Sequence, residues 1–522
     1  MGKKCIRGAL IVLTFAVYLC VTGQNAKSTE AHGKTLTKIS VDSNSETSDI
    51  KEDKKKSTVT QVAEEATQMQ DLTEAFDVIL KGATKEFIAG YAVDDTFLMW
   101  LEAQYGADLI IDLAYCVMDD EMSPDIWYEK TGNSMHVLWL QFCRDSGFQK
   151  YQLDHVYWQE TADPSQVVLS FTGDFNFAKG WYTTEYMESQ PNGLADCFSE
   201  DLLEQMRGSD ILIMNNEFTY MEEHQAEALP GKAYTFRAEP ETVELLEEFG
   251  VDGVTLANNH VYDYGERGLL DTMQYLNEAE IPYVGAGEDI EEASKILYYV
   301  ANGKKIAIVS ATQIERSTLY TREATQTDAG VLKTLNPERF LRVIEQAKAN
   351  SDYVIALVHW GTEGTLFSEE SQRILANQFA NAGVDAIIGA HPHRLQGVAY
   401  YSGVPTAYSL GNFWFSNGTL YTTLAQIVIE EDGSLQMRFV PCVQENMVTR
   451  MLTDQEEKDG FYHYLASISS DIGIDEEGNV YDKSAEDYPA DLVRYDSETS
   501  TTPIRGTSDN EGNAIDIVGN LK

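Results

Sequence analysis

The sequence predicts an α/β protein whose main domain, residues 165–450, is built in layers, because three patterns recur along it. Short apolar runs end in polar residues, as buried strands do. Stretches with helical spacing and readable ends lie between these runs. Asn-Gly and Asp-Gly pairs between apolar runs indicate two hairpins. We therefore expect one mixed sheet or two packed sheets, with helices against them.

Each expected strand is an apolar run that leads into polar residues. The five runs are VVLSFTGD, DILIMNNE, VDGVTLANNH, YVIALVHWG and VDAIIGAHPH. The expected helices run from Pro240 to Gly250, from Asn336 and Pro337 onward, and from a Ser368 cap to Gly383. Asn302-Gly303 and Asp432-Gly433 predict the turns of the two hairpins.

Three segments precede this domain. Residues 1–23 place three basic residues before an uncharged run, which is typical of a signal peptide or a membrane anchor. Residues 24–70 contain no aromatic residue and are rich in charged and hydroxyl side chains, which predicts a disordered linker. In residues 71–160, FLMWLEAQY and MHVLWLQF have helical spacing, which predicts a small helical accessory unit.

The segment after the main domain is acidic. Residues 451–522 hold 17 acidic and 5 basic residues and few apolar runs. A strongly charged segment with little to bury does not offset the entropy lost on folding. We therefore expect a largely disordered tail.

Composition excludes several classes of protein. The 522 residues carry a formal charge of −46, which would repel a nucleic-acid backbone. A mean hydropathy of −0.30 argues against a membrane protein with many spans. The six cysteines contain no CxxC pair, so a thiolate zinc site is not expected, and the choice is between one disulfide and free buried thiols.

Polar residues able to bind metals follow the expected strands. They are Asp174, Glu217, Asn259, His260, His359, His391 and His393. Because ligands bind at the carboxyl ends of strands in α/β sheets, we expect these side chains to converge. Taken singly, the two acids are better explained as helix N-caps or loop acids, and His359 as a core histidine. The clustering of four of the nine histidines at strand ends favours a site.

Six of these residues form a ligand set for divalent cations. Two carboxylates, one amide and three imidazoles suit Zn, Mn or Fe. The set is Asp174, Glu217, Asn259, His359, His391 and His393. Six ligands exceed what one tetrahedral ion needs, so we expect two divalent ions that share a bridging carboxylate.

His260 is expected to have a different role. It directly follows Asn259, so the two side chains point in different directions, and an imidazole suits a general acid that protonates a leaving group. Asp263 lies three residues on and is expected to orient it. A purely hydrogen-bonding role for His260 is the alternative.

Six motifs in order resemble the CapA family of poly-γ-glutamate capsule synthesis proteins, a branch of the calcineurin-like metallophosphoesterase superfamily. They are TGDFNF, NNEFTY, LANNHVYDYG, HWGTE, GAHPHRLQG and YSLGNFWF, within residues 167–442. The resemblance implies a four-layer sandwich, in which two mixed β-sheets are flanked by helices, and a crevice for two metal ions.

The resemblance also assigns roles. Asp174 matches the aspartate of the first motif, and Glu217 matches the bridging acid. Asn259-His260, His359 and the His391–His393 pair match the later ligand motifs. One position departs from the pattern: Asn176 stands where the superfamily has histidine, which implies that one of the two ions is held weakly.

We therefore expect an extracytoplasmic protein, secreted or tethered to the membrane only by its N-terminal segment. It would act in the biosynthesis of poly-γ-glutamate or a related envelope polymer, as a hydrolase or transferase using metal-activated water. Its expected partners are the anionic polymer and its membrane synthesis and export machinery, and no nucleic acid. Two alternatives stay open: a non-catalytic assembly or export factor with a degenerate metal site, and a generic secreted phosphodiesterase.

Overall fold

The computed structural model describes residues 72–315, 320–500, 507–508 and 514–515. The predicted signal segment 1–23 and linker 24–70 lie outside the described residues. The chain divides into residues 1–74 and 75–522, and the second unit holds all the elements described below. No helix within the described ranges is long and apolar enough to cross a membrane.

Helices form the first part of this unit, as their apolar spacing predicts. They are α2 (Asp95–Tyr105), α3 (Ala107–Met118), α4 (Asp125–Thr131), α5 (Met135–Ser146) and the 3-10 turn η2 (Lys150–Leu153). The Ser134 side chain accepts a hydrogen bond from Val137 N and caps α5. Val137 and Leu140 of α5 pack on Val300, which attaches the helices to the neighbouring sheet. The predicted helical segment ends in a strand, β1 (Val156–Trp158), which pairs with that sheet.

The first large sheet is mixed and has eight strands. Its order is β19-β18-β17-β2-β3-β6-β7, with β16 paired to β2. The strands are β2 (Gln166–Phe175), β3 (Ile211–Asn216), β6 (Gly253–Thr255), β7 (Tyr283–Val284), β16 (Asn412–Trp414), β17 (Leu420–Glu430), β18 (Leu435–Glu445) and β19 (Val448–Met451). Strands β2, β3, β6 and β7 run parallel, whereas β17, β18 and β19 are antiparallel additions.

The second large sheet has seven strands in the order β1-β9-β10-β12-β13-β15-β14. Its further strands are β9 (Leu297–Ala301), β10 (Lys304–Thr312), β12 (Tyr353–His359), β13 (Ala386–Ala390), β14 (Val398–Tyr401) and β15 (Val404–Ala407). The predicted hairpins are confirmed between β9 and β10 and between β17 and β18. Asn302 and Gly303 have φ values of 44° and 68°, as a tight two-residue hairpin turn requires.

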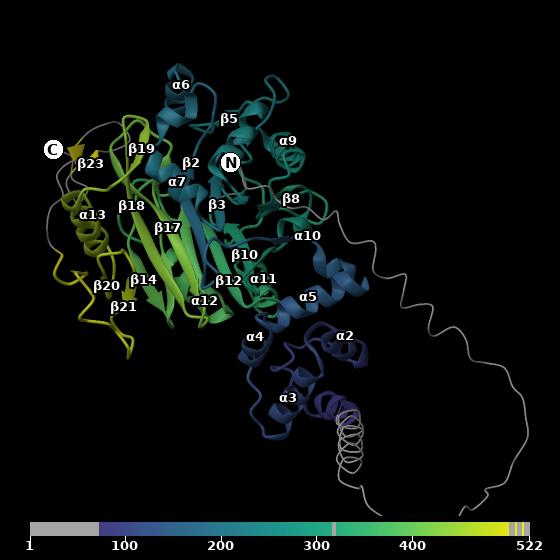
Figure 1. The fold of residues 1–522 in the computed structure, drawn as a ribbon. Helices are drawn as coiled ribbons and strands as arrows, with labels where there is room; N and C mark the ends of the chain where they lie inside the picture. Colours follow the sequence, from purple (N-terminus) through teal and green to yellow (C-terminus); the bar gives the residue numbers. More distant parts are fainter. Residues whose placement is uncertain (1–71, 316–319, 501–506, 509–513, 516–522) are drawn as a thin grey trace, which may run out of the picture. The chain divides into compact units, whose positions relative to one another are not determined.

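The two sheets pack face to face, and helices cover their outer faces (Figure 1). Alternate residues of one strand serve different layers: Ile355 and Leu357 of β12 join the core between the sheets, whereas Val354 and Val358 face the helices. The outer helices are α6 (Tyr182–Ser189), α7 (Glu200–Arg207), α8 (Leu245–Phe249) and α9 (Gly265–Glu278) on the first sheet, and α10 (Ile290–Ala293), α11 (Glu338–Lys348) and α12 (Glu370–Ala382) on the second. The predicted four-layer α/β sandwich is confirmed.

Local sequence determines where two of these helices begin or end. Pro240 opens the 3-10 turn η4 (Pro240–Glu244), which continues into α8 and ends at Gly250 with φ 77°. The N-cap of α12 is Glu369, one residue after the predicted Ser368, because Glu369 and Gln372 form a capping box. Of the four cysteines within the described residues, all are free, and Cys143, Cys197 and Cys442 are buried.

The prediction of a largely disordered tail from residue 451 is wrong over residues 455–500. This segment forms α13 (Gln455–Ser467) and a small sheet of β20 (Ile472–Ile474), β21 (Val480–Asp482) and β22 (Tyr495–Asp496). Phe461, Leu465 and Ile472 are fully buried in the core between the large sheets. A few well-spaced apolar residues therefore outweigh the acidic composition, since every acidic side chain of the segment except the buried Asp475 stays at least partly exposed. Two short strands, β23 (Thr507–Ser508) and β24 (Ala514–Ile515), pair with each other.

Candidate metal centre

The predicted site residues meet where the carboxyl ends of the parallel strands of both sheets lie together. Asp174 is near the end of β2, and Glu217 directly follows β3. His359 is the last residue of β12, and His391 directly follows β13. Each of these side chains is at most 5% exposed. The site therefore draws ligands from two sheets and forms only when they pack.

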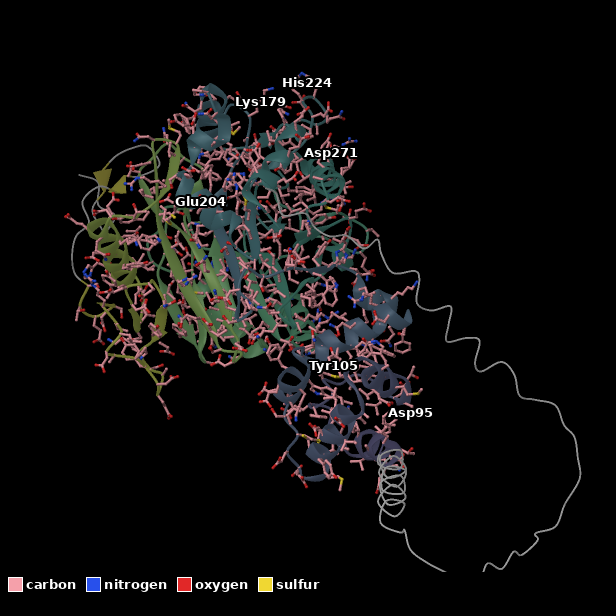
Figure 2. All side chains as sticks on the ribbon, in the orientation of Figure 1. Asp95, Tyr105, Lys179, Glu204, His224 and Asp271 are labelled. Carbon is pink, nitrogen blue, oxygen red and sulfur yellow. The ribbon has the colours of Figure 1, made fainter. Side chains whose placement is uncertain are left out.

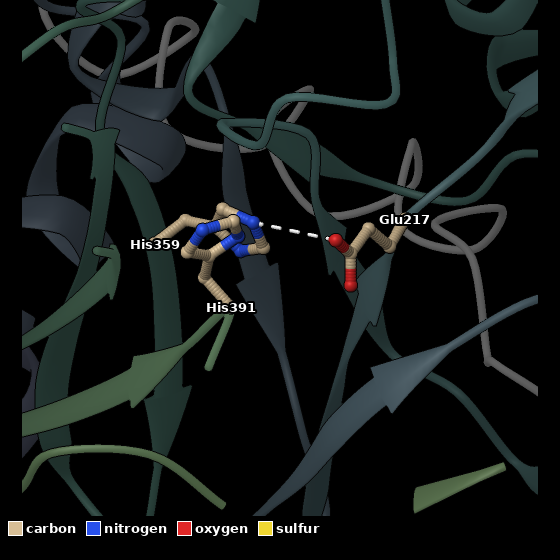
Figure 3. Close-up of side chains that lie close together, drawn as sticks. All are labelled: Glu217, His359 and His391. Carbon is tan, nitrogen blue, oxygen red and sulfur yellow. Dashed lines mark ion pairs between the residues drawn. The ribbon is translucent and has the colours of Figure 1, made fainter. Parts of the chain in front are cut away.

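One group of candidate ligands consists of Glu217, His359 and His391, whose nearest ligand atoms lie within 4.8 Å of one another. Glu217 Oε1 is 3.4 Å from His359 Nε2, and Figure 3 shows both imidazoles on one side of this carboxylate. Asn259 Oδ1 lies 2.7 Å from the same His359 nitrogen. The amide predicted as a ligand thus adjoins this group.

A second group consists of Asp174, Glu217 and His393, whose ligand atoms again lie within 4.8 Å of one another. His393 Nδ1 is 3.0 Å from Asp174 Oδ2, and His393 Nε2 is 3.9 Å from Glu217 Oε1. Glu217 belongs to both groups. The structure therefore brings all six predicted ligands together and gives Glu217 the shared position.

The backbone at His391 and His393 is strained. His391 and His393 have φ values of 99° and 56°, in the left-handed region that residues with a side chain rarely adopt. Such outliers persist where the surrounding structure holds them, and they cluster at functional sites. A Cβ on Gly173 would lie 2.0 Å from Gly411 O, so only glycine allows Asp174 N to reach that oxygen at 2.8 Å.

Neighbouring amides orient the candidate ligands. Asn215 Nδ2 donates to Asp174 Oδ1 over 2.9 Å. Asn412 Oδ1 lies 2.8 Å from His393 Nδ1. Partners of this kind fix the ring orientation of metal-binding histidines. Asn215 lies in β3, two residues before Glu217, which directly follows that strand.

The electrostatics of the site fit a bound cation. Burial, reinforced by the charge of Asp174, raises the pKa of Glu217 well above its usual range. Burial opposes the charged form of Asp174, but the adjacent His393 outweighs it and keeps this pKa below its usual value. Burial lowers the pKa of His359 to about 3, which leaves a neutral imidazole. Metal-binding imidazoles must be neutral.

Unpaired polar atoms lead to the same conclusion. Among the described residues, no N–H or O–H group donates a hydrogen bond to either oxygen of Glu217, and His359 Nδ1 has no partner. A fully buried carboxylate without donors is costly. A divalent cation would compensate for it, and carboxylates with neutral imidazoles are the donors that Zn, Mn and Fe accept. The residues present therefore fit the predicted ions.

His260 and Asp263 form a pair beside the ligands. His260 Nδ1 lies 2.9 Å from Asp263 Oδ2, and both side chains are buried. Burial lowers the pKa of His260, although the Asp263 carboxylate opposes this shift. Asp263 also accepts hydrogen bonds from Phe236 N, at 2.6 Å, and from Lys232 Nζ, at 2.5 Å. No sequence pattern pointed to Lys232, which lies in a loop without a recognisable motif.

Asn176 does not offer its oxygen to the site. Its Oδ1 accepts a hydrogen bond from Ala178 N over 2.6 Å, and its side chain is fully buried. The group that contains Asp174 therefore gains no ligand oxygen at this position. The weak binding of one ion, which the resemblance implies from Asn176, stays a prediction.

Three comparisons with known proteins bear on this site. The family model described as "Bacterial capsule synthesis protein PGA_cap" matches residues 168–417, which include every candidate site residue. The capsule biosynthesis protein CapA of Bacillus anthracis is 34% identical over 240 residues, which is 45% of this chain and 57% of that protein. The PGA biosynthesis protein CapA of Bacillus subtilis (strain 168) is 32% identical over 278 residues, 52% of this chain and 70% of that protein. The matched part thus spans less than two thirds of the first relative.

Among solved structures, a crystal structure of a novel phosphatase from Mycoplasma pneumoniae aligns with a TM-score of 0.35 and 12% sequence identity. The alignment covers 54% of this chain and 95% of that one.

Proposed function

Because the chain belongs to the CapA family of bacterial capsule synthesis proteins, we propose that it is a metal-dependent hydrolase or transferase of envelope-polymer synthesis. The polymer would be poly-γ-glutamate or a related chain, since the B. subtilis relative is named a PGA biosynthesis protein. The protein would act outside the cytoplasm, together with the membrane machinery that makes and exports the polymer.

One observation carries the proposal: Glu217 is shared by two groups of buried ligands. Glu217, Asn259, His359 and His391 would hold one divalent ion, and Asp174, Glu217 and His393 would hold the other. Divalent ions in such a pair supply Lewis acidity and a low pKa for bound water. Mn, Zn and Fe all suit this donor set.

His260 would serve as the proton donor to a leaving group. Its Nδ1 faces Asp263, which leaves Nε2 as the ring nitrogen that can hold a proton for the substrate. Asp263 fixes the ring orientation, because its other contacts to Phe236 N and Lys232 hold the carboxylate in place.

An anionic polymer meets a chain with a formal charge of −46. Contact between them needs a local positive potential, and divalent ions are often the largest local charges in a site. Two ions beside Asp174 and Glu217 would exceed the charge of these two carboxylates. The metal centre is therefore the place at which we expect an acidic protein to receive a polyanion.

The test uses the purified full chain, loaded in turn with Mn²⁺, Zn²⁺ and Fe²⁺. We expect cleavage of bis(p-nitrophenyl) phosphate or of poly-γ-glutamate by wild type, and its loss in Glu217→Ala and His391→Ala. His224→Ala is the control, since this side chain is 88% exposed. Cleavage of the phosphodiester but not of the polymer would favour a generic secreted phosphodiesterase instead.

A second candidate function is a non-catalytic assembly or export factor. The contact between Asn176 Oδ1 and Ala178 N favours it, because it leaves the group of Asp174, Glu217 and His393 with three ligands. A chain that is inert with all three metals, and whose capsule phenotype survives Glu217→Ala and His391→Ala, would establish this candidate and overturn the catalytic one.

A further inference from the structure

A loop that the ligand motifs do not include lies on the His260–Asp263 pair. Residues 221–236 connect β4 (Thr219–Tyr220) and β5 (Arg237–Ala238). Asp263 binds this loop at three points. Its main-chain oxygen accepts from Leu229 N over 2.8 Å, Oδ2 accepts from Phe236 N, and Oδ1 accepts from Lys232 Nζ. The residue that orients His260 is thus also the anchor of the loop.

Lys232 joins the loop to the residues of the site by its ammonium group. Its side chain is 5% exposed, although lysine is almost never buried without partners. The ammonium donates to Asp263 Oδ1 and to the main-chain oxygen of Asn259, and it lies 3.4 Å from Glu315 Oε1. One cation therefore ties a carboxylate that orients His260 to the backbone of a candidate metal ligand.

The loop also touches the imidazole itself. The ring of Phe236 lies 4.4 Å from the ring of His260, centroid to centroid. Movement of the loop would therefore change the packing of His260 as well as the hydrogen bonds of Asp263. The loop thus contacts both the turn and the imidazole, and Lys232 is the charged residue that joins the loop to the turn.

We propose that Lys232 is a positioning residue of the metal centre, which fastens the 221–236 loop to the turn over residues 259–263 and so fixes the Asn259 amide and the His260 imidazole. Where it concerns His260, the inference rests on the proposed function. Where it concerns Asn259, it needs only that the site binds a divalent ion. Mutation of a residue that holds a metal ligand in place typically lowers metal affinity by about 10- to 100-fold.

The test compares Lys232→Met with Lys232→Arg in the full chain. Lys179→Met is the matched control, because Lys179 pairs with Glu239 at the surface, is 51% exposed, and is labelled in Figure 2. The first readout is Mn²⁺ affinity by titration calorimetry. The second is cleavage of the loop by a glutamate-specific protease, for which the loop offers exposed Glu222, Glu223 and Glu227.

We expect Lys232→Met to weaken Mn²⁺ binding by about tenfold and to speed cleavage of the loop, because the ammonium link is lost. Lys232→Arg should keep much of the Mn²⁺ affinity and much of the resistance of the loop to cleavage, since it keeps the charge. Lys179→Met should match wild type in both readouts. If Lys232→Met does not fold by circular dichroism, Lys232→Gln, which removes the charge that pairs with Asp263, replaces it and should weaken Mn²⁺ binding in the same direction.

Wild-type affinity together with wild-type cleavage in the folded variant would overturn the inference. Neither readout depends on turnover. A wild-type chain that binds Mn²⁺ and cleaves no substrate would contradict the proposed function, while the affinity of Lys232→Met would still decide the role of Lys232. A wild type that bound no Mn²⁺ would overturn the part of the inference that concerns the metal centre, and the rate of loop cleavage would then decide only whether Lys232 fastens the loop.

Discussion

Glu217 Oε1 lies 3.4 Å from His359 Nε2, and this contact joins the end of β3 in one large sheet to the end of β12 in the other. The two residues are far apart in the sequence, so the site is a product of sheet packing and not of any local motif. The shared position of Glu217 leads directly to the first prediction.

Glu217→Gln should lose metal from both groups of ligands. The amide that replaces the carboxylate is a weaker ligand and carries no charge, so we expect less bound Mn²⁺ per chain than in wild type, with loss from both groups of ligands. His391→Ala touches only one group and should lose one ion. Elemental mass spectrometry after desalting measures both. The exposed Glu204→Gln should match wild type, and an unchanged metal content in Glu217→Gln would contradict the shared role.

His260→Asn should separate proton transfer from metal binding. Loss of a positioned general acid typically slows a reaction by about 10²- to 10⁴-fold. We expect a fall of that size in kcat on the model phosphodiester, with the metal content of wild type. The exposed His224→Asn is the matched control. Activity within about twofold of wild type in His260→Asn would show that this imidazole moves no proton.

Phe461→Ala should destabilise the whole sandwich, because Phe461 lies in the core between the large sheets. Truncation of a buried phenylalanine costs about 3–5 kcal/mol of unfolding free energy. Leu492→Ala, in the same segment but 62% exposed, should change it by less than about 0.5 kcal/mol. Urea denaturation measures both. Equal stability of the two variants would mean that α13 adds nothing to the core.

Replacement of His136 should weaken the acid sensitivity of the fold. Burial, and then Lys305 and Lys348, lowers the pKa of His136 from 6.5 to about 3. Between these values the unfolded chain binds a proton that the native one does not, so the free energy of unfolding falls as pH falls through this window. This group contributes a slope of at most about 1.4 kcal/mol per pH unit.

His136→Gln should therefore lose less stability than wild type between about pH 6 and about pH 4, by urea denaturation. In the wild type, His136 Nδ1 contacts Tyr91 OH at 2.9 Å, so the variant is also expected to lose some stability at neutral pH. The exposed His224→Gln should keep the wild-type slope. A slope in His136→Gln equal to that of wild type would show that this imidazole is not responsible.

Much of the fold followed from local patterns. The strand that ends at His359 is a continuous apolar run up to that residue, and the turn at Asn302 and Gly303 needs positive φ at both residues. These signals are short-range and easily read from sequence. Composition gave a wrong prediction of disorder for the segment around Phe461. This segment is acidic on average, yet its few apolar residues are buried in the core and allow it to fold.

The candidate ligands were predictable for a similar reason, since strand ends of α/β sheets converge. Lys232 was not predictable, because its role depends on a loop that returns to Asp263 from another part of the chain. The contact of Asn176 with Ala178 N was equally hidden, since sequence alone does not say where an amide oxygen points. Contacts that depend on how loops cross a site need the three-dimensional structure.

The most direct test of a shared Glu217 is an anomalous difference map from crystals of the full chain soaked with Zn²⁺. Two peaks are predicted, each about 2.0–2.2 Å from an oxygen of Glu217. One peak should lie near His359 and His391, and the other near Asp174 and His393. A map in which zinc binds elsewhere, or in which no peak lies within reach of Glu217, would contradict the account.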